Sequence, residues 1–341
     1  MKKTLLALAV LAAAGSAQAI ELYNQDGVTV NLKGDIEVRY KKNFSKTDNL
    51  KQEIDDADIA IDTRYQVNDD FSIGGFIEYS GDNSDRAQSG STTTTTLLDG
   101  TGQPVTDKNG DEVKVVTAVK GGPGMGNTYV GFYSKSMGSL KFGRLDTILD
   151  DAGIGSDYLF GLDEFFNDLQ TGGEEAVRYD LDLGSVYFGA GWVQDHYEQK
   201  ASSADHHYDL KLGARVADFD FTGYYAETAL DTSTKTDKLA GLEARFGGIE
   251  NVKLSAAYYN VSGNTESQTF ALAADLMVDK WKFATAVAST DFDAAASEDF
   301  VQWFVNAGYG IAPNTTLYAE VGGNDKNNTE VGYGFGVKAT F

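Results

Sequence analysis

The chain has 341 residues, with 51 Asp and Glu against 28 Lys and Arg, so its formal net charge is −23. This excess of negative charge argues against binding to nucleic acid. Cysteine is absent, which excludes disulfides, and the combination of 3 prolines with 38 glycines, 18 tyrosines and 19 phenylalanines favours strands over most of the length.

The N-terminus has the three parts of a secretory signal peptide. Lys2 and Lys3 precede an apolar run from Leu5 to Leu11, and Ala17-Gln18-Ala19 supplies an A-x-A cleavage site. The run is too short for a stable transmembrane helix, and no other stretch approaches the ~18 apolar residues that such a helix needs. We therefore expect cleavage after Ala19, export from the cytoplasm, and a single folded domain over residues 20–341.

Segments of alternating apolar and polar residues recur along the remaining chain. Because successive side chains of a strand point to opposite faces, each segment is predicted to be a strand with one apolar and one polar face. In the first segment, Val30 and Leu32 alternate with Asn31 and Lys33. The sixteen predicted strands are 27–40, 58–67, 71–80, 127–135, 139–145, 174–182, 185–194, 206–216, 219–227, 237–246, 252–261, 268–278, 281–290, 300–310, 315–322 and 330–341.

The links between these segments alternate between short and long. Links such as 68–70, 136–138 and 279–280 are predicted to be tight turns. The long polar links are 41–57, 81–126, 146–173, 195–205, 228–236, 262–267, 291–299 and 323–329. A soluble β-sandwich would show the same alternation within its strands, but the alternating links are typical of a transmembrane barrel. We therefore predict an all-β fold, a 16-stranded antiparallel transmembrane β-barrel with short periplasmic turns and long external loops.

The longest link, 81–126, contains a Ser/Thr run at 91–96 and an Asn109-Gly110 pair between β-prone flanks. The pair predicts a type I′ hairpin turn. Asp107, Asp111 and Glu112 nearby do not have the spacing of an EF-hand calcium loop, and no metal site or cofactor is predicted.

The link 146–173 differs from the other loops because it mixes many aromatic and aliphatic residues with carboxylates. A loop surrounded by solvent does not need this many apolar residues, so we expect the segment to fold against the barrel wall and to expose its carboxylates to the channel. The carboxylates are Asp146, Asp150, Asp151, Asp157, Asp163, Glu164 and Asp168.

The last strand ends at Phe341, with Tyr333, Phe335 and Val337 on one face and glycines, Lys338 and Thr340 on the other. This end resembles the terminal strand of bacterial outer-membrane proteins, in which the final Phe is read by the barrel-insertion machinery.

Four motifs together resemble the general diffusion porins of Gram-negative outer membranes. They are residues 21–27, the turn at 66–71, Phe142-Gly143-Arg144 before the acidic third loop, and Phe341. The resemblance implies a homotrimer in outer-membrane lipid and lipopolysaccharide, with a water-filled channel for small hydrophilic solutes. It also implies that the third loop folds inward and constricts the pore, and that loop 81–126 reaches a neighbouring subunit.

In that family, acidic residues of the third loop face basic residues on the opposite wall. The basic candidates with lumen parity here are Arg39, Arg64, Arg144 and Arg178, each of which could instead pair with a neighbouring wall carboxylate. Asp35 and Asp58 stand where family members often have Arg or Lys. Because fixed anions outnumber cations, we predict passive diffusion with a preference for cations, and no reaction chemistry.

Two other functions remain as alternatives. An outer-membrane hydrolase would need a tuned base, but the three histidines, His196, His206 and His207, lie in or beside one loop, and no G-x-S-x-G or H-E-x-x-H motif is present. A substrate-selective channel would use an aromatic track for a sugar chain. The tyrosines with lumen parity that could form such a track are Tyr187, Tyr224, Tyr259 and Tyr318.

Overall fold

The structure is a computed structural model that describes residues 19–81, 92–96, 114–118, 124–162, 165, 169–194, 206–229, 235–293 and 297–341. These residues form strands almost throughout, with one short 3-10 helix, η1 (Ile148–Asp151). The strands are β1 (Ile20–Gln25), β2 (Val28–Lys42), β3 (Lys51–Gln66), β4 (Phe71–Ser80), β5 (Thr92–Thr96), β6 (Lys114–Ala118), β7 (Gly124–Ser134), β8 (Gly138–Asp146), β9 (Gly172–Asp182), β10 (Val186–Val193), β11 (His206–Val216), β12 (Phe219–Ala229), β13 (Asp237–Ile249), β14 (Val252–Ser262), β15 (Ser267–Val278), β16 (Trp281–Phe292), β17 (Phe300–Ala312), β18 (Thr315–Asn324) and β19 (Gly332–Thr340). In this part of the chain no helix has the length and apolar character needed to cross a bilayer.

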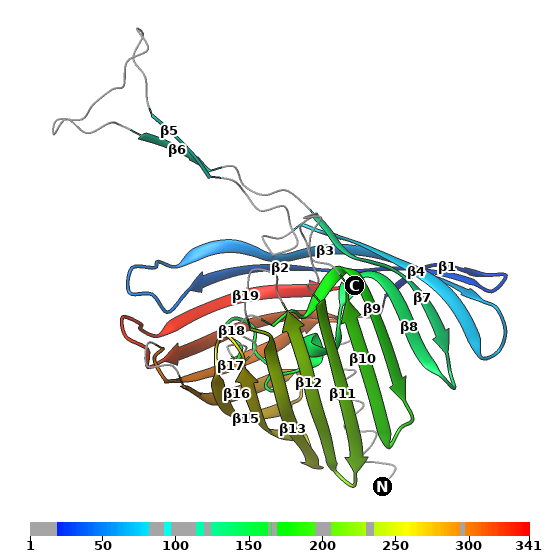
Figure 1. Ribbon diagram of the computed structural model, residues 1–341. Helices are drawn as coiled ribbons and strands as arrows, with labels where there is room; N and C mark the ends of the chain where they lie inside the picture. The colour runs from blue at the N-terminus through cyan, green and yellow to red at the C-terminus, as the bar shows by residue number, and fades with distance from the viewer. Residues whose placement is uncertain are drawn as a thin grey trace, which may run out of the picture.

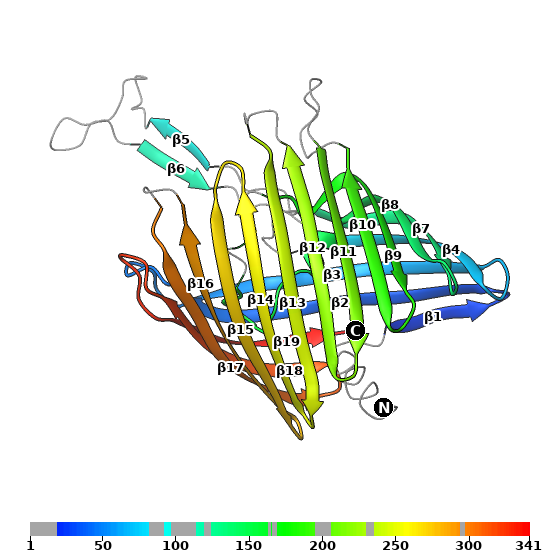
Figure 2. The ribbon, with the colours of Figure 1, turned by 60° about the horizontal axis from the view of Figure 1, so that its bottom comes forward.

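The strands form a closed antiparallel barrel in which neighbours in sequence are neighbours in space (Figures 1 and 2). Closure comes from the pairing of β19 with β2, in which Val337 lies opposite Val38. β1 pairs with the first half of β2, beyond the end of β19. Because β1 and β19 lie end to end along β2, they share one position, and the 17-stranded sheet closes as the predicted barrel of sixteen.

The two faces of the wall differ as the alternation predicts. On β15, Phe270 and Leu272 point outward and are 60% and 53% exposed, whereas the intervening Ala271 is 2% exposed. The same contrast on β13 places Leu242 outside and Glu243 inside. The outer surface is therefore an apolar band that lipid can cover, and the polar residues face the interior.

Most predicted strands agree with the structure to within a few residues, and two differences have a physical cause. β3 begins at Lys51 rather than at 58, because its polar first part pairs with β2 through an irregular register and ion pairs of Arg39. β1 was not predicted as a strand, because it has only six residues and its strand form depends on pairing with the part of β2 that β19 does not reach.

Within the loop predicted at 81–126, β5 and β6 pair in a separate two-stranded sheet outside the barrel wall (Figure 1). The predicted turn at Asn109-Gly110 lies outside the described residues, as do residues 1–18 of the expected signal peptide.

Candidate functional site

The third loop, residues 147–171 between β8 and β9, folds into the barrel and packs against its inner wall. Its apolar side chains are buried and form the main hydrophobic cluster of the described chain together with inward-facing residues of β12–β18. Phe165 stacks on Tyr259 of β14 with ring centroids 3.7 Å apart, and Tyr158 stacks on Tyr318 of β18 at 4.4 Å. The predicted inward fold of this loop is confirmed.

Small inward-facing side chains on the wall make room for the loop. A Cβ placed on Gly155 would lie 3.4 Å from the Cβ of Ala286. Larger residues at such positions would push the loop backbone away from the wall. The buried alanines of β14–β16 under the loop are Ala257, Ala271, Ala273, Ala284, Ala286 and Ala288.

Three buried wall carboxylates fix the loop by its backbone. Asp209 on β11 accepts the Leu149 N–H at 2.7 Å. Glu243 on β13 accepts the Gly153 N–H at 2.6 Å, and Glu320 on β18 accepts N–H groups farther along the loop. Each of these three residues is at most 1% exposed. Hydrogen bonds to ionised acceptors are stronger than neutral ones, so these contacts set the path of the loop.

Three of the four tyrosines with lumen parity take part in this packing, and the fourth, Tyr187, contacts other side chains of the wall. Tyr224, Tyr259 and Tyr318 are buried. The hydroxyl of Tyr224 donates to the backbone oxygen of Asp151, and that of Tyr259 donates to Glu243 at 2.6 Å. Tyr187 donates to Asp220 at 2.6 Å and lies beneath the guanidinium of Arg215.

The structure describes four of the seven predicted loop carboxylates. Asp150, Asp151 and Asp157 are exposed on the loop. Asp146 accepts a hydrogen bond from the Asn127 amide at 2.9 Å at the end of β8. The remaining three predicted carboxylates, Asp163, Glu164 and Asp168, lie outside the described residues.

The four predicted basic residues all pair with carboxylates. Arg39 contacts Glu53 at 2.7 Å and Asp55, and Arg64 contacts Asp62 at 3.0 Å and lies over the Tyr133 ring. Arg144 contacts Glu174 at 3.1 Å.

Arg178 holds both the loop and the wall. Its guanidinium contacts Asp151 of the loop at 2.6 Å and Asp180 of β9 at 2.9 Å, and it donates to the backbone oxygen of Thr147 at 2.8 Å. Lys211 of β11 also contacts Asp151.

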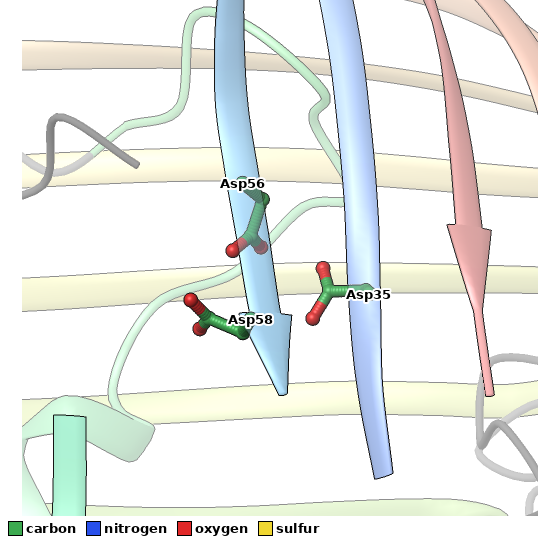
Figure 3. A group of neighbouring side chains, drawn as sticks. All are labelled: Asp35, Asp56 and Asp58. Carbon is green, nitrogen blue, oxygen red and sulfur yellow. The ribbon is translucent and has the colours of Figure 1, made fainter. Parts of the chain in front are cut away.

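Asp35 on β2 and Asp56 and Asp58 on β3 form an acidic wall cluster (Figure 3). One carboxylate oxygen from each residue lies within 4.8 Å of the others. The Lys338 ammonium lies 2.7 Å from Asp35 and 3.1 Å from Asp56, so a cation of the chain already neutralises part of the cluster. The contacts given above place the loop against β9 and β11–β18. The three carboxylates stand on β2 and β3, where Lys41 of β2 also donates to the Leu159 backbone oxygen of the loop at 2.8 Å.

Arg64 and Arg178 belong to a larger set of lumen-facing cations, which we call the basic belt and which lies in the middle or the short-turn half of the strands. The sequence signal for it is a Lys or Arg flanked by outward-facing apolar residues, as with Lys282 between Trp281 and Phe283. Most belt residues pair with carboxylates, for example Lys253 with Asp275 at 3.3 Å. The belt consists of Lys33, Arg64, Lys141, Arg178, Lys211, Arg215, Arg245, Lys253, Lys282 and Lys338.

A cavity of about 630 Å³ opens beside the loop at the belt. Asp151 and Asp180 line it together with Lys211, Arg215 and Arg245. Its polar and charged lining is suited to water and small hydrophilic solutes rather than to an apolar ligand.

Comparison with known proteins agrees with this architecture. Porin-like protein H of Photobacterium profundum is 28% identical over the full length of both chains. A trimer form of OmpT, an outer membrane protein of Vibrio cholerae, has the same fold, with a TM-score of 0.67 at 16% identity over 93% of this chain and 100% of that one. An anion-selective porin from Comamonas acidovorans matches with a TM-score of 0.66 at 12% identity, covering 92% of this chain and 100% of that one.

The family of Gram-negative porins matches residues 4–329, which is nearly the whole chain. The structure agrees with this match, because the chain forms a closed barrel with an apolar outer band and an inward-folded third loop. The chain therefore belongs to the Gram-negative porin family and forms a channel in the outer membrane.

Proposed function

We propose that the protein is a general porin for the passive diffusion of small hydrophilic solutes and ions, with a preference for cations. The observation that carries the preference is the placement of carboxylates on two sides of the lumen. Asp150, Asp151 and Asp157 are exposed on the third loop. Asp35, Asp56 and Asp58 gather on β2 and β3.

The lumen cations offset only part of this negative charge. Arg39 and Arg64, on the strands where an opposing basic wall was expected, pair with carboxylates of β3. The belt likewise pairs with wall and loop carboxylates. In a water-filled passage lined by excess fixed anions, mobile cations are concentrated and mobile anions are depleted. Salt should weaken the effect, because the Debye length falls from ~10 Å at 0.1 M to ~3 Å at 1 M.

The barrel fold alone does not decide ion preference, since a solved porin with this fold is described as anion-selective. Side chains in the lumen must therefore decide it. We also propose that the third loop forms the constriction, and that the chain assembles as a homotrimer after removal of residues 1–19. Lipid, lipopolysaccharide and the insertion machinery acting on Phe341 would be its partners in that assembly.

The test is single-channel recording in a planar bilayer across a tenfold KCl gradient. We expect a zero-current potential of the sign that favours K⁺, which shrinks when both solutions are raised to high salt. A potential that favours Cl⁻ would overturn the preference. Saturable block of the current by one sugar would instead support a substrate-selective channel.

A further inference from the structure

The two ends of the third loop meet at one place on the inner wall. Thr147, at the start, donates its N–H to the backbone oxygen of Thr171, at the end, at 2.8 Å. Both ends also bond to β11 and β12: the Leu149 N–H donates to Asp209 at 2.7 Å, and the Gln170 N–H donates to Thr228 at 3.2 Å. The wall residues that hold the two ends are thus Asp209 and Thr228.

His207 connects these two wall residues. Its Nε2 lies 3.1 Å from the Asp209 carboxylate and its Nδ1 lies 2.8 Å from the Thr228 hydroxyl. Nε2 is also 3.3 Å from the hydroxyl of Thr147. The imidazole has no exposed surface, and neither do Asp209, Thr147 and Thr228.

The partners fit the imidazole tautomer that has its hydrogen on Nε2. In that tautomer Nε2–H donates to the Asp209 carboxylate, which also accepts the Leu149 N–H, and Nδ1 is an acceptor. Thr228 then donates its hydroxyl hydrogen to Nδ1, while its oxygen accepts the Gln170 N–H. A continuous chain of hydrogen bonds therefore runs from Gln170 through the imidazole to Leu149.

We propose that His207 is a positioning residue that locks both ends of the third loop to the wall and so holds the channel in one open geometry. The inference concerns the channel and not its ion preference, so it stands or falls independently of the zero-current potential. A buried side chain with two separate hydrogen-bonding atoms is suited to this role, because each atom serves one end of the loop.

Two substitutions separate the ends. His207→Gln keeps an amide near the Nε2 position and so retains a partner for Asp209, whereas His207→Asn keeps one near the Nδ1 position and retains a partner for Thr228. His207→Leu removes both. His206→Leu is the matched control, since His206 is the adjacent residue and its ring stacks with Tyr208.

Because the chain has no cysteine, single cysteines can report on each end. Asp150→Cys marks the start and Gln170→Cys marks the end, and the rate of reaction with a water-soluble thiol reagent measures how far each is freed. We expect the cysteine at position 150 to react faster in His207→Asn than in the unmodified background, and the cysteine at position 170 to react faster in His207→Gln. In His207→Leu both cysteines should react faster. Single-channel traces of the Leu variant should lose the steady open level that His206→Leu retains.

The proposal would be overturned if the reaction rates of both cysteines rose equally in the Asn and Gln variants, because that would indicate a general loosening of the loop. A steady open level in His207→Leu would overturn it as well. If His207→Leu fails to fold, judged by heat-modifiable mobility on a gel, the Asn and Gln variants still decide between the outcomes.

Discussion

Glu320 on β18 accepts the backbone N–H of Phe160 at 2.7 Å with one oxygen and that of Tyr158 at 2.6 Å with the other. Asn306 of β17 donates a further hydrogen bond to the same carboxylate at 2.9 Å. Since Glu320 is 1% exposed, water cannot replace these partners. The loop is therefore held at this point by its backbone, whatever side chains it has.

Glu320→Gln should loosen this part of the loop with little change in shape. The amide keeps one acceptor, but its NH₂ group faces a backbone N–H, and a buried donor left without a partner costs about 1–3 kcal/mol. We expect a lower unfolding temperature in detergent and a noisier open-channel current. Glu298→Gln is the control, because Glu298 bonds Asn327 on the exposed surface. Equal unfolding temperatures for the two variants would contradict the prediction.

The acidic wall cluster should contribute directly to ion preference. Replacing Asp35, Asp56 and Asp58 together by Asn keeps their size and removes their charge, and it leaves Lys338 with Glu37 at 3.3 Å as a remaining partner. We expect the zero-current potential in a KCl gradient to move toward zero. Glu250→Gln, in the turn between β13 and β14, controls for loss of charge outside the lumen. A potential that stays at the unmodified value would place the selectivity on the loop alone.

The barrel could be predicted from the sequence because its signal is repeated in every strand. Outward apolar residues such as Phe270 and Leu272 alternate with small or polar ones, and lipid imposes that pattern on each strand separately. The inward fold of the third loop was also predictable, since its aromatic residues need a surface to cover.

The contacts that fix the loop were not predictable from the sequence. Asp209, Glu243 and Glu320 carry no local sign that they bond to a backbone far along the chain. His207 looked like a residue at the edge of a loop, and only the pairing of β11 with β12 places it beside Thr228. The partners of Arg39 and Arg178 depend in the same way on register and on where the loop comes to rest.

Gly191 on β10 should be required for the start of the loop to lie against the wall. A Cβ there would lie 2.7 Å from the Cβ of Thr147 and would also overlap the Asp209 carboxylate. Overpacking of this kind costs about 1–3 kcal/mol. We expect Gly191→Ala to lower the unfolding temperature and alter the conductance. Gly223→Ala on β12, where the nearest atoms are 3.9 Å away, should behave like the unmodified protein, and similar losses in both would contradict the argument.

Asp70 should make the periplasmic edge sensitive to acid. Its carboxylate accepts the Ser134 hydroxyl at 2.7 Å and the Ser136 N–H at 3.1 Å, which joins two neighbouring turns. These hydrogen bonds, that of the Ser134 hydroxyl first, lower the pKa of Asp70 below its ordinary value. A group with a lowered pKa in the folded state stabilises it above the unfolded pKa of about 3.9 and loses that effect as pH falls through the folded pKa.

Asp70→Asn should therefore lower the unfolding temperature at neutral pH and have a smaller effect in strong acid. Asp69→Asn in the same turn is the control for charge. The linkage would be contradicted if the unfolding temperatures of Asp70→Asn and the unmodified protein differed by the same amount from pH 7 down to about pH 2.

Depth in the membrane should govern the cost of a charge on the outer face. Leu242, in the middle of β13, and Ile249, at its short-turn end, are 57% and 51% exposed, so neither is packed against the protein. Arginine at the bilayer midplane costs about 2–4 kcal/mol and near the interface about 0–1 kcal/mol. We expect Leu242→Arg to reduce the free energy of unfolding in lipid vesicles by the larger amount and Ile249→Arg by the smaller.

The pair isolates depth, because strand, residue type and exposure are nearly matched. If lipid did not cover this face, two equally exposed positions would tolerate arginine equally well, and equal costs would contradict a transmembrane barrel. A soluble sandwich gives a third result, since Leu242 would then lie in a dry core and its arginine variant would not fold in water. Urea titration of the vesicle-folded variants distinguishes the first two outcomes, and refolding of Leu242→Arg in water without lipid tests the third.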